Sequence, residues 1–331
     1  MKHTIATSLK ALVSFQLLFF GCSTTTSKRD LPALDFKQEM RTLVQEISSY
    51  AKRARPGFIV IPQNGQELVT TDGMPASPVN IGYLDVIDGI GREDLFYGYT
   101  GDNQATSAGD RGSILPFLQT AQSQGIRILV TDYCSTPSKI DASYDSNASY
   151  GFISFAADRR DLDHLPDYPA FPRQANTDTV IRLSEAKNFL YLLDPSSFAD
   201  KATYVDAVSA TNYDMLITDL FFEDSVLTAS DVAALREKAN GGKRLVIAYM
   251  SIGEAEEYRY YWQSSWSHQR PDWLESENPK WKGNYKVRYW DSDWKRILTG
   301  NDSSYVKKIL DAGCDGVYLD IIDAFEYFEN Y

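Results

Sequence analysis

Short, continuous apolar runs recur along the chain, and stretches with helical spacing separate them. Eight runs are the principal strand candidates: 58–65, 83–90, 126–132, 188–194, 214–219, 244–251, 286–291 and 316–323. Helices are indicated between them, for example at residues 113–125 and at 229–242, where Ser230 is the expected cap. Continuous apolar strands that alternate with helices are typical of an α/β fold with a parallel sheet. Eight such strands, without a glycine-rich phosphate turn, favour a (β/α)8 TIM barrel over a doubly wound sheet.

Two further segments bear on this pattern. Residues 36–50 place apolar side chains at helical spacing, which predicts a helix that stops before Pro56 and Gly57. Residues 151–177 are rich in proline and polar residues and interrupt the alternation. This segment is predicted to be a long surface connection that contains an extra short strand.

The N-terminus has the layout of a signal peptide. Lys2 and Lys10 surround a short apolar run that ends at Gly21 and Cys22, and a Ser/Thr-rich stretch follows. The run is too short to span a bilayer comfortably. Because a Gly-Cys junction resembles a bacterial lipoprotein signal, we expect Cys22 to be lipidated, with plain secretion as the alternative. The expected organisation is a signal peptide at 1–22, a polar tether at 23–34 and the barrel at 35–331. A secreted or cell-envelope lipoprotein, at the outer membrane or cell surface, is the expected location.

The overall charge and the cysteines exclude several classes of function. A net charge of -12 makes nucleic acid or an anionic membrane surface an improbable partner. Cys134 and Cys314 are lone thiols in strand contexts, and the chain has 3 histidines, so no metal site, redox motif or cofactor is expected. The 21 tyrosines and 6 tryptophans suit either sugar rings or core packing. We expect a monomer.

Acidic residues stand at the ends of most predicted strands. They are Asp132, Asp194, Asp219, Glu254, Asp291 and Asp320. One such residue alone is usually a cap, but in a barrel these ends converge on the face where active sites are built. Clustered carboxylates repel one another, which separates their pKa values as acid–base chemistry requires. The sequence therefore predicts that Asp320 faces a shared acidic cleft and that Asp323 lines its rim.

Five stretches carry a resemblance to a known family: 54–68, 87–98, 244–262, 271–291 and 313–328. They resemble a bacterial and archaeal group of extracellular proteins related to the endo-α-1,4-polygalactosaminidases of glycoside hydrolase family 114. The resemblance covers most of the chain from about Phe36 onward. It implies a glycoside hydrolase that acts on an amino-sugar-containing polysaccharide.

The order of these stretches differs from that in the resembling proteins. There, the blocks that correspond to 188–328 come first, and those that correspond to 54–98 follow. Joining the C-terminal end to residues 36–50 restores the usual order, so the chain resembles a circular permutant of the barrel. Permutation is tolerated where the new ends are neighbours in space. A truncated or misassembled gene model is the alternative.

Glycosidases need two carboxyl groups beside the scissile bond, and we expect Asp219 and Glu254 to supply them. The resemblance matches the family's catalytic aspartate to Asp219 through the context "YDMLITDLF". The family's catalytic glutamate lies near a strand that corresponds to "GNYKVRYWD", and no glutamate stands there. Its role therefore falls to Glu254, Asp291 or Asp320.

Further residues are expected to bind the sugar. They are Gln63, Asn64, Glu93, Asp132, Tyr249, Arg259, Tyr289, Asp291, Asp320 and Asp323, with Trp290 as another possible stacking surface. A non-catalytic carbohydrate-binding lipoprotein that keeps the cleft is the alternative function. A site for Ca²⁺ or Mg²⁺ among the acids is a minor option, because no loop has the spacing of a calcium-binding motif.

Overall fold

Parallel strands form the centre of the computed structural model, which describes residues 33–330. One sheet has the order β1 (Ile59–Pro62), β15 (Gly316–Asp320), β11 (Leu245–Ser251), β8 (Met215–Thr218) and β7 (Leu190–Leu192). A second has the order β2 (Gly89–Glu93), β5 (Arg127–Tyr133) and β6 (Ile153–Ala157). All pairings within both sheets are parallel. This confirms the predicted α/β fold with a parallel sheet.

The two sheets meet at β1 and β2. A parallel bridge joins Gln63 to Gly91, and the Asn64 amide donates a hydrogen bond to the Gly91 carbonyl at 2.8 Å. On the other side, β6 lies near β7, where the rings of Phe155 and Phe189 are 5.9 Å apart. The side chains of β1, β7, β8 and β11 are buried, as the continuous apolar runs require.

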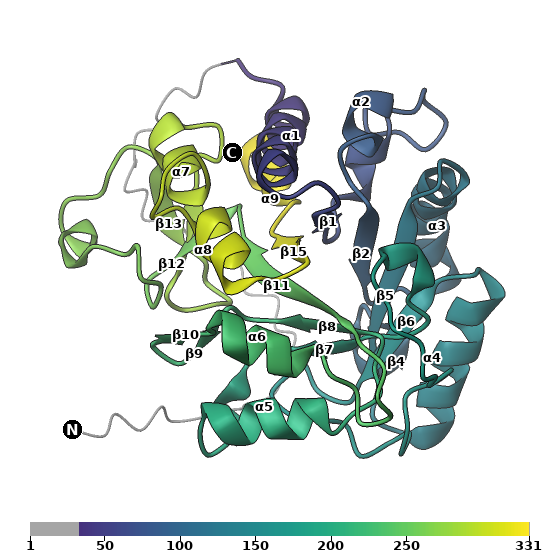
Figure 1. Ribbon diagram of the computed structural model, residues 1–331. Helices are drawn as coiled ribbons and strands as arrows, with labels where there is room; N and C mark the ends of the chain where they lie inside the picture. The colour runs from purple at the N-terminus through teal and green to yellow at the C-terminus, as the bar shows by residue number, and fades with distance from the viewer. Residues whose placement is uncertain (1–32, 331) are drawn as a thin grey trace, which may run out of the picture. The chain divides into compact units, whose positions relative to one another are not determined.

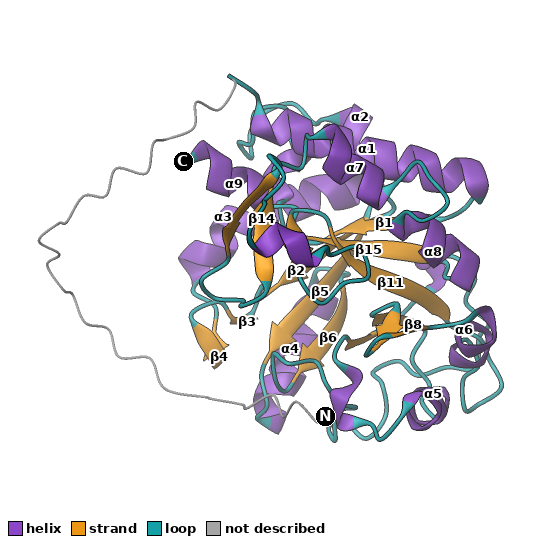
Figure 2. Cartoon of the chain, turned by 90° about the vertical axis from the view of Figure 1, so that its left-hand side faces the viewer, coloured by secondary structure: helices purple, strands orange, loops and turns teal. Residues whose placement is uncertain are grey.

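Helices surround these strands (Figure 2). They are α1 (Phe36–Ala54), α2 (Ile81–Leu84), α3 (Ala108–Ser123), α4 (Pro137–Ser149), α5 (Lys201–Ser209), α6 (Ala229–Leu235), α7 (Ser292–Leu298), α8 (Tyr305–Ala312) and α9 (Ala324–Glu329). Residues 33–330 also contain three small antiparallel sheets: β3 (Tyr97–Gly98) with β4 (Gly101–Ala105), β9 (Phe221–Phe222) with β10 (Ser225–Val226), and β14 (Asn284–Val287) between β12 (Glu254–Glu256) and β13 (Leu274–Glu277).

One predicted strand of the parallel sheet is wrong, and another segment takes its place. The run 286–291 contributes only to β14, which pairs antiparallel with β12 and β13, and Asp291 is the N-cap of α7. Residues 153–157 form β6, the extra short strand predicted within 151–177, and it pairs in parallel with β5 rather than standing apart in a surface connection. Both runs are short and apolar, so the local sequence pattern alone does not show which of them joins a parallel sheet.

Two boundaries also differ from the predictions. Tyr83 and Leu84 belong to α2, so the strand expected at 83–90 begins only at Gly89. The cap of α6 is Thr228 and not Ser230, because Thr228 and Asp231 form a reciprocal capping box. Helix α1 was predicted correctly, and Asp35 caps it by accepting a hydrogen bond from the Gln38 amide.

The first and last helices lie side by side (Figure 1). The rings of Phe36 and Phe328 stack 5.6 Å apart, and Lys37 pairs with Glu329 at 2.5 Å. The Tyr289 hydroxyl donates to the Phe36 carbonyl at 2.8 Å. Helix α1 therefore packs where the chain leaves the last strand.

Cys134 and Cys314 are free and buried, as expected of small core residues. Cys22, the expected lipidation site, lies outside the described residues, as does the expected signal peptide. No helix within residues 33–330 has the length and apolar character needed to cross a bilayer.

Candidate active site at the carboxyl ends of the strands

A hydrogen-bonded cluster joins the carboxyl ends of β1, β2 and β5 to β7. The Gln63 amide nitrogen donates to Glu93 Oε2 at 2.5 Å, and its oxygen accepts from the Tyr191 hydroxyl at 2.9 Å. The Tyr133 hydroxyl donates to Glu93 Oε1, and Asn64 donates to Glu93 Oε2 at 3.4 Å. Glu93 is thus a partly exposed carboxylate that three side chains hold in place.

Asp320 ends β15 and is also partly exposed. Its Oδ2 accepts a hydrogen bond from the Tyr249 hydroxyl at 2.7 Å, and its Oδ1 accepts from the Ile321 amide at 2.8 Å. Burial, followed by the negative charge of Glu93, raises the pKa of Asp320 to about 7, against the opposing effect of the Tyr249 hydrogen bond. A carboxyl group with this pKa can hold or release a proton near neutral pH.

Asp323 lies beside this pair, at the N-cap of α9. Burial raises its pKa, while the nearby charges of Lys286 and Arg92 act in the opposite direction. Asp323 also contributes to the raised pKa of Asp320. The structure therefore brings Glu93, Asp320 and Asp323 into one electrostatically coupled group.

Asp219 follows β8 and pairs with an arginine. Arg259 Nη1 and Nη2 contact its two carboxylate oxygens at 2.8 Å and 2.7 Å, and the Phe221 amide donates to Asp219 Oδ1 at 2.8 Å. Arg259 also pairs with the buried Glu256 at 2.6 Å. The Asp219 side chain keeps 15% of its surface exposed, so it remains accessible at one edge.

Glu254 has no exposed surface. Lys286 pairs with its Oε1 at 2.6 Å, Asn278 donates to the same oxygen at 2.8 Å, and Asn284 donates to Oε2 at 3.4 Å. These partners come from the hairpin of β13 and β14, which closes over the carboxylate. In this arrangement Glu254 cannot contact a substrate directly, and its clearest role is to hold Lys286 and the hairpin.

The remaining strand-end acids have structural partners. Asp132 is fully buried and accepts from the amides of Phe96 and Tyr97 and from the side chains of Ser143 and Asn147. Asp194 and Asp291 are caps that accept hydrogen bonds from backbone amides two residues onward. Tyr289 and Trp290 pack against α1 and α9 rather than beside Asp320.

The sequence reasoning did not identify Tyr133 and Tyr191 as parts of the cluster. Tyr133 is two residues beyond Thr131, which pairs with Glu93, so the two-residue period of a strand places Tyr133 on the same face. Strand periodicity could therefore have identified Tyr133. Nothing local links Tyr191 to Gln63, because that contact depends on how the two strands meet.

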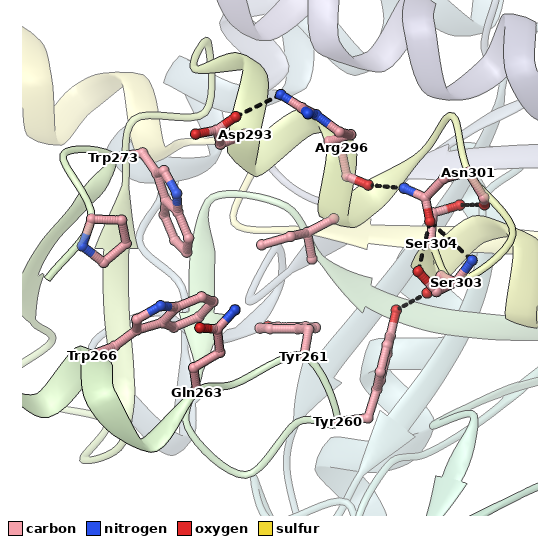
Figure 3. A pocket seen from close by; sticks show the side chains of 12 residues that line it. Tyr260, Tyr261, Gln263, Trp266, Trp273, Asp293, Arg296, Asn301, Ser303 and Ser304 are labelled. Carbon is pink, nitrogen blue, oxygen red and sulfur yellow. Dashed lines mark hydrogen bonds and ion pairs between the residues drawn. The ribbon is translucent and has the colours of Figure 1, made fainter. Parts of the chain in front are cut away.

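A cavity of about 640 Å³ has a lining of its own (Figure 3). Its lining comes from the segment after β12, from α7 and from the loop before α8, and includes Tyr260, Trp266, Trp273 and Arg296. None of the strand-end acids described above lines it. Within residues 33–330, no group of three or more His, Cys, Asp or Glu side chains is arranged to hold a metal ion.

Comparisons with known proteins identify relatives of part of the chain. Residues 170–330 match the profile of glycoside-hydrolase family GH114. A stretch of 153 residues, 46% of this chain, is 35% identical to an uncharacterized protein of Methanocaldococcus jannaschii and covers 42% of that protein. A stretch of 128 residues, 39% of this chain, is 38% identical to an uncharacterized protein of Deinococcus radiodurans and covers 39% of it. In each case the matched part spans less than half the length of the relative.

Proposed function

Residues 170–330 are related to glycoside-hydrolase family GH114, and on that basis we propose that this protein is a glycoside hydrolase acting on an amino-sugar-containing polysaccharide. An endo-acting enzyme similar to the α-1,4-polygalactosaminidases is the form that the resemblance supports. The observation that carries the proposal is the coupled pair of Asp320 and Glu93 at the carboxyl ends of β15 and β2.

The two carboxyl groups suit different roles. Protonated Asp320 donates its proton to the glycosidic oxygen as the bond to the leaving sugar breaks. The Glu93 carboxylate, held by Gln63, Asn64 and Tyr133, acts as the nucleophile or as the base that activates water. Asp219 and Arg259 then bind the sugar beside them.

We propose that both sheets belong to one (β/α)8 barrel. The bridge between Gln63 and Gly91 supports continuity at β1 and β2, and the contact of Phe155 with Phe189 supports closure at β6 and β7. The order β1-β2-β5-β6-β7-β8-β11-β15 then returns to β1, which pairs with β15.

The barrel is proposed to be circularly permuted relative to its family. The stretch matched to the family is the second part of the chain, and the resembling segments 54–68 and 87–98 precede it. The packing of α1 on α9 supports this reading, because α1 lies where the helix after the last strand would continue.

A reducing-end assay on de-N-acetylated α-1,4-linked galactosamine polymer tests the activity. Wild type should release reducing ends, and Asp320→Asn and Glu93→Gln should each lower kcat at least about a hundredfold. Asp194→Asn is a matched control, since it is another strand-end acid but serves only as a cap. Binding by wild type without turnover would instead support the non-catalytic carbohydrate-binding alternative.

The location is proposed to be the cell envelope, through a lipid on Cys22. The Gly-Cys junction after a short apolar run supports this. Mass spectrometry of the mature protein should find a diacylglyceryl group on an N-terminal Cys22. An unmodified N-terminus at another residue would favour plain secretion.

A further inference from the structure

The aromatic cavity beside α7 shares a chain segment with the Asp219 site. Arg259 binds Asp219, and the next two residues, Tyr260 and Tyr261, line the cavity. The ring of Tyr260 also stacks 5.7 Å from that of Phe221, whose amide donates to Asp219. One short segment therefore connects the strand-end site to the cavity.

The walls of the cavity are rigid and aromatic. Trp266 and Trp273 meet edge to face with centroids 5.0 Å apart, and Trp273 packs against the fully buried Trp294 at 5.2 Å. The Trp294 indole nitrogen donates to the Ile252 carbonyl at 2.9 Å. These contacts fix the indole rings before any ligand arrives, so little conformational entropy is lost when one binds.

Polar side chains also line the cavity, and Figure 3 shows Gln263 beside Trp266, with Asp293 and Arg296 at α7. Asp293 and Arg296 form an exposed ion pair at 2.7 Å, and the exposed side chain of Gln263 has no hydrogen-bond partner among residues 33–330. Asn301 is already occupied, because its amide nitrogen donates to the Arg296 carbonyl and its oxygen accepts from Ser303. Gln263, Asp293 and Arg296 therefore offer both donors and acceptors to a ligand.

We propose that this cavity is a distal subsite for a sugar unit of the same polysaccharide that the strand-end site binds. A pyranose has apolar C–H faces for the aromatic rings and hydroxyl groups for the polar side chains, and the volume is that of ordinary ligand pockets. Tyr258 offers a further exposed ring beside Arg259, which binds Asp219. The residue is 60% exposed, yet its ring is held by a hydrogen bond from its hydroxyl to Glu256 at 2.6 Å and by the Arg259 guanidinium 5.0 Å from the ring centroid.

This inference rests on the proposed function for its ligand, but its test includes binding measured without turnover. Calorimetry with the full chain should show that Arg296→Ala and Gln263→Ala each weaken binding of the long galactosamine polymer about fivefold. Free galactosamine, a single sugar unit that can occupy only one of the two places at a time, should show a much smaller change. If the polymer is hydrolysed, the same variants should raise KM for it about fivefold, with a much smaller effect on kcat.

Arg182→Ala is the matched control. Arg182 is 73% exposed and pairs with Glu185 at the same three-residue spacing as Asp293 and Arg296, but it lies before β7 and lines no part of the cavity. The Arg182→Ala variant should bind the polymer as tightly as wild type does. Unchanged polymer binding in both Arg296→Ala and Gln263→Ala, with unchanged melting temperature, would overturn the proposal. Absence of hydrolysis by wild type, with binding still weakened by these variants, would overturn only the catalytic function.

Discussion

Asp320 combines a partly exposed carboxyl group with surroundings that oppose its ionisation. Burial and the charge of Glu93 raise its pKa to about 7, while the Tyr249 hydroxyl favours the charged form. Apart from burial, the protonation state of Asp320 is therefore influenced by side chains on two other strands, Glu93 of β2 and Tyr249 of β11. Each of these influences can be removed separately by substitution.

Tyr249→Phe should move the alkaline limb of the pH–rate profile to higher pH. The hydrogen bond from Tyr249 stabilises ionised Asp320. Its removal therefore raises the pKa of Asp320 further, and the acid stays protonated up to a higher pH. Tyr191→Phe is the control, because that hydroxyl donates to Gln63. The pH dependence of kcat measures both variants, and a shift of the limb to lower pH in Tyr249→Phe would contradict Asp320 as the acid.

Asp320→Asn should stabilise the protein at alkaline pH. The folded-state pKa lies above the value of about 4 expected when unfolded, so the native state holds the extra proton between these values and loses stability as pH rises toward 7. Asparagine does not ionise, so the substitution removes this loss. It should raise the free energy of unfolding by roughly 1–2 kcal/mol at pH 8 and change it little at pH 4. Urea unfolding at both pH values measures this. A destabilised variant at pH 8 would mean that Asp320 is mainly a structural cap.

At the scale of elements, local hydrogen bonds decide at which residue a helix begins and which carboxyl groups remain accessible to a substrate. Thr228 caps α6 through the Asp231 amide at 3.2 Å, and the Thr228 amide returns a hydrogen bond to the Asp231 side chain at 2.8 Å. The hairpin of β13 and β14 encloses Glu254 in a similar way, with Lys286 and two asparagines. Carboxylates that have hydrogen-bond partners of this kind do not take part in the solvent-facing site.

Thr228→Ala should lower the free energy of unfolding by about 1 kcal/mol, because it leaves a helix N-terminal amide without its partner. Ser230→Ala should change stability by less than about 0.5 kcal/mol, since Ser230 lies inside the first turn, where alanine favours the helix. Chemical denaturation of both variants provides the comparison. Equal losses of unfolding free energy in the two variants would argue against Thr228 as the cap of α6.

At the scale of the whole molecule, the sequence predicts the fold class because seven apolar runs do contribute to the parallel sheets. The sequence did not show that 153–157, and not 286–291, belongs to the parallel sheets. Pairing with other strands decides this, because one run pairs with β5 and the other with β12. The candidate site was predictable at Gln63, Glu93 and Asp320, which end their strands. Glu254 was less predictable, since the residues that bury it come from a separate hairpin.

The proximity of α1 and α9 predicts that the chain can be reconnected. A protein that starts at Phe171, joins Asn330 to Asp35 through a short Gly-Ser linker, and ends at Ala170 should fold and keep the activity of wild type. Phe171 is 71% exposed, so the new ends lie at the surface. Circular dichroism and melting temperature test this. A control opened between Ile247 and Ala248, inside the buried β11, should not fold, and equal failure of both proteins would contradict the close approach of the helices.

The pairing of β1 with β15 also bears on the order of events during folding. Ile59 lies opposite Gly316, so β1 gains this neighbour only after all the residues between them have been synthesised. Until then, one edge of β1 presents unpaired backbone amides and carbonyls, which are prone to bind other chains. Closing so long a loop is slow, since its entropy is lost before the pairing stabilises it. This edge of β1 therefore stays open to other chains until β15 has been made and pairs with it.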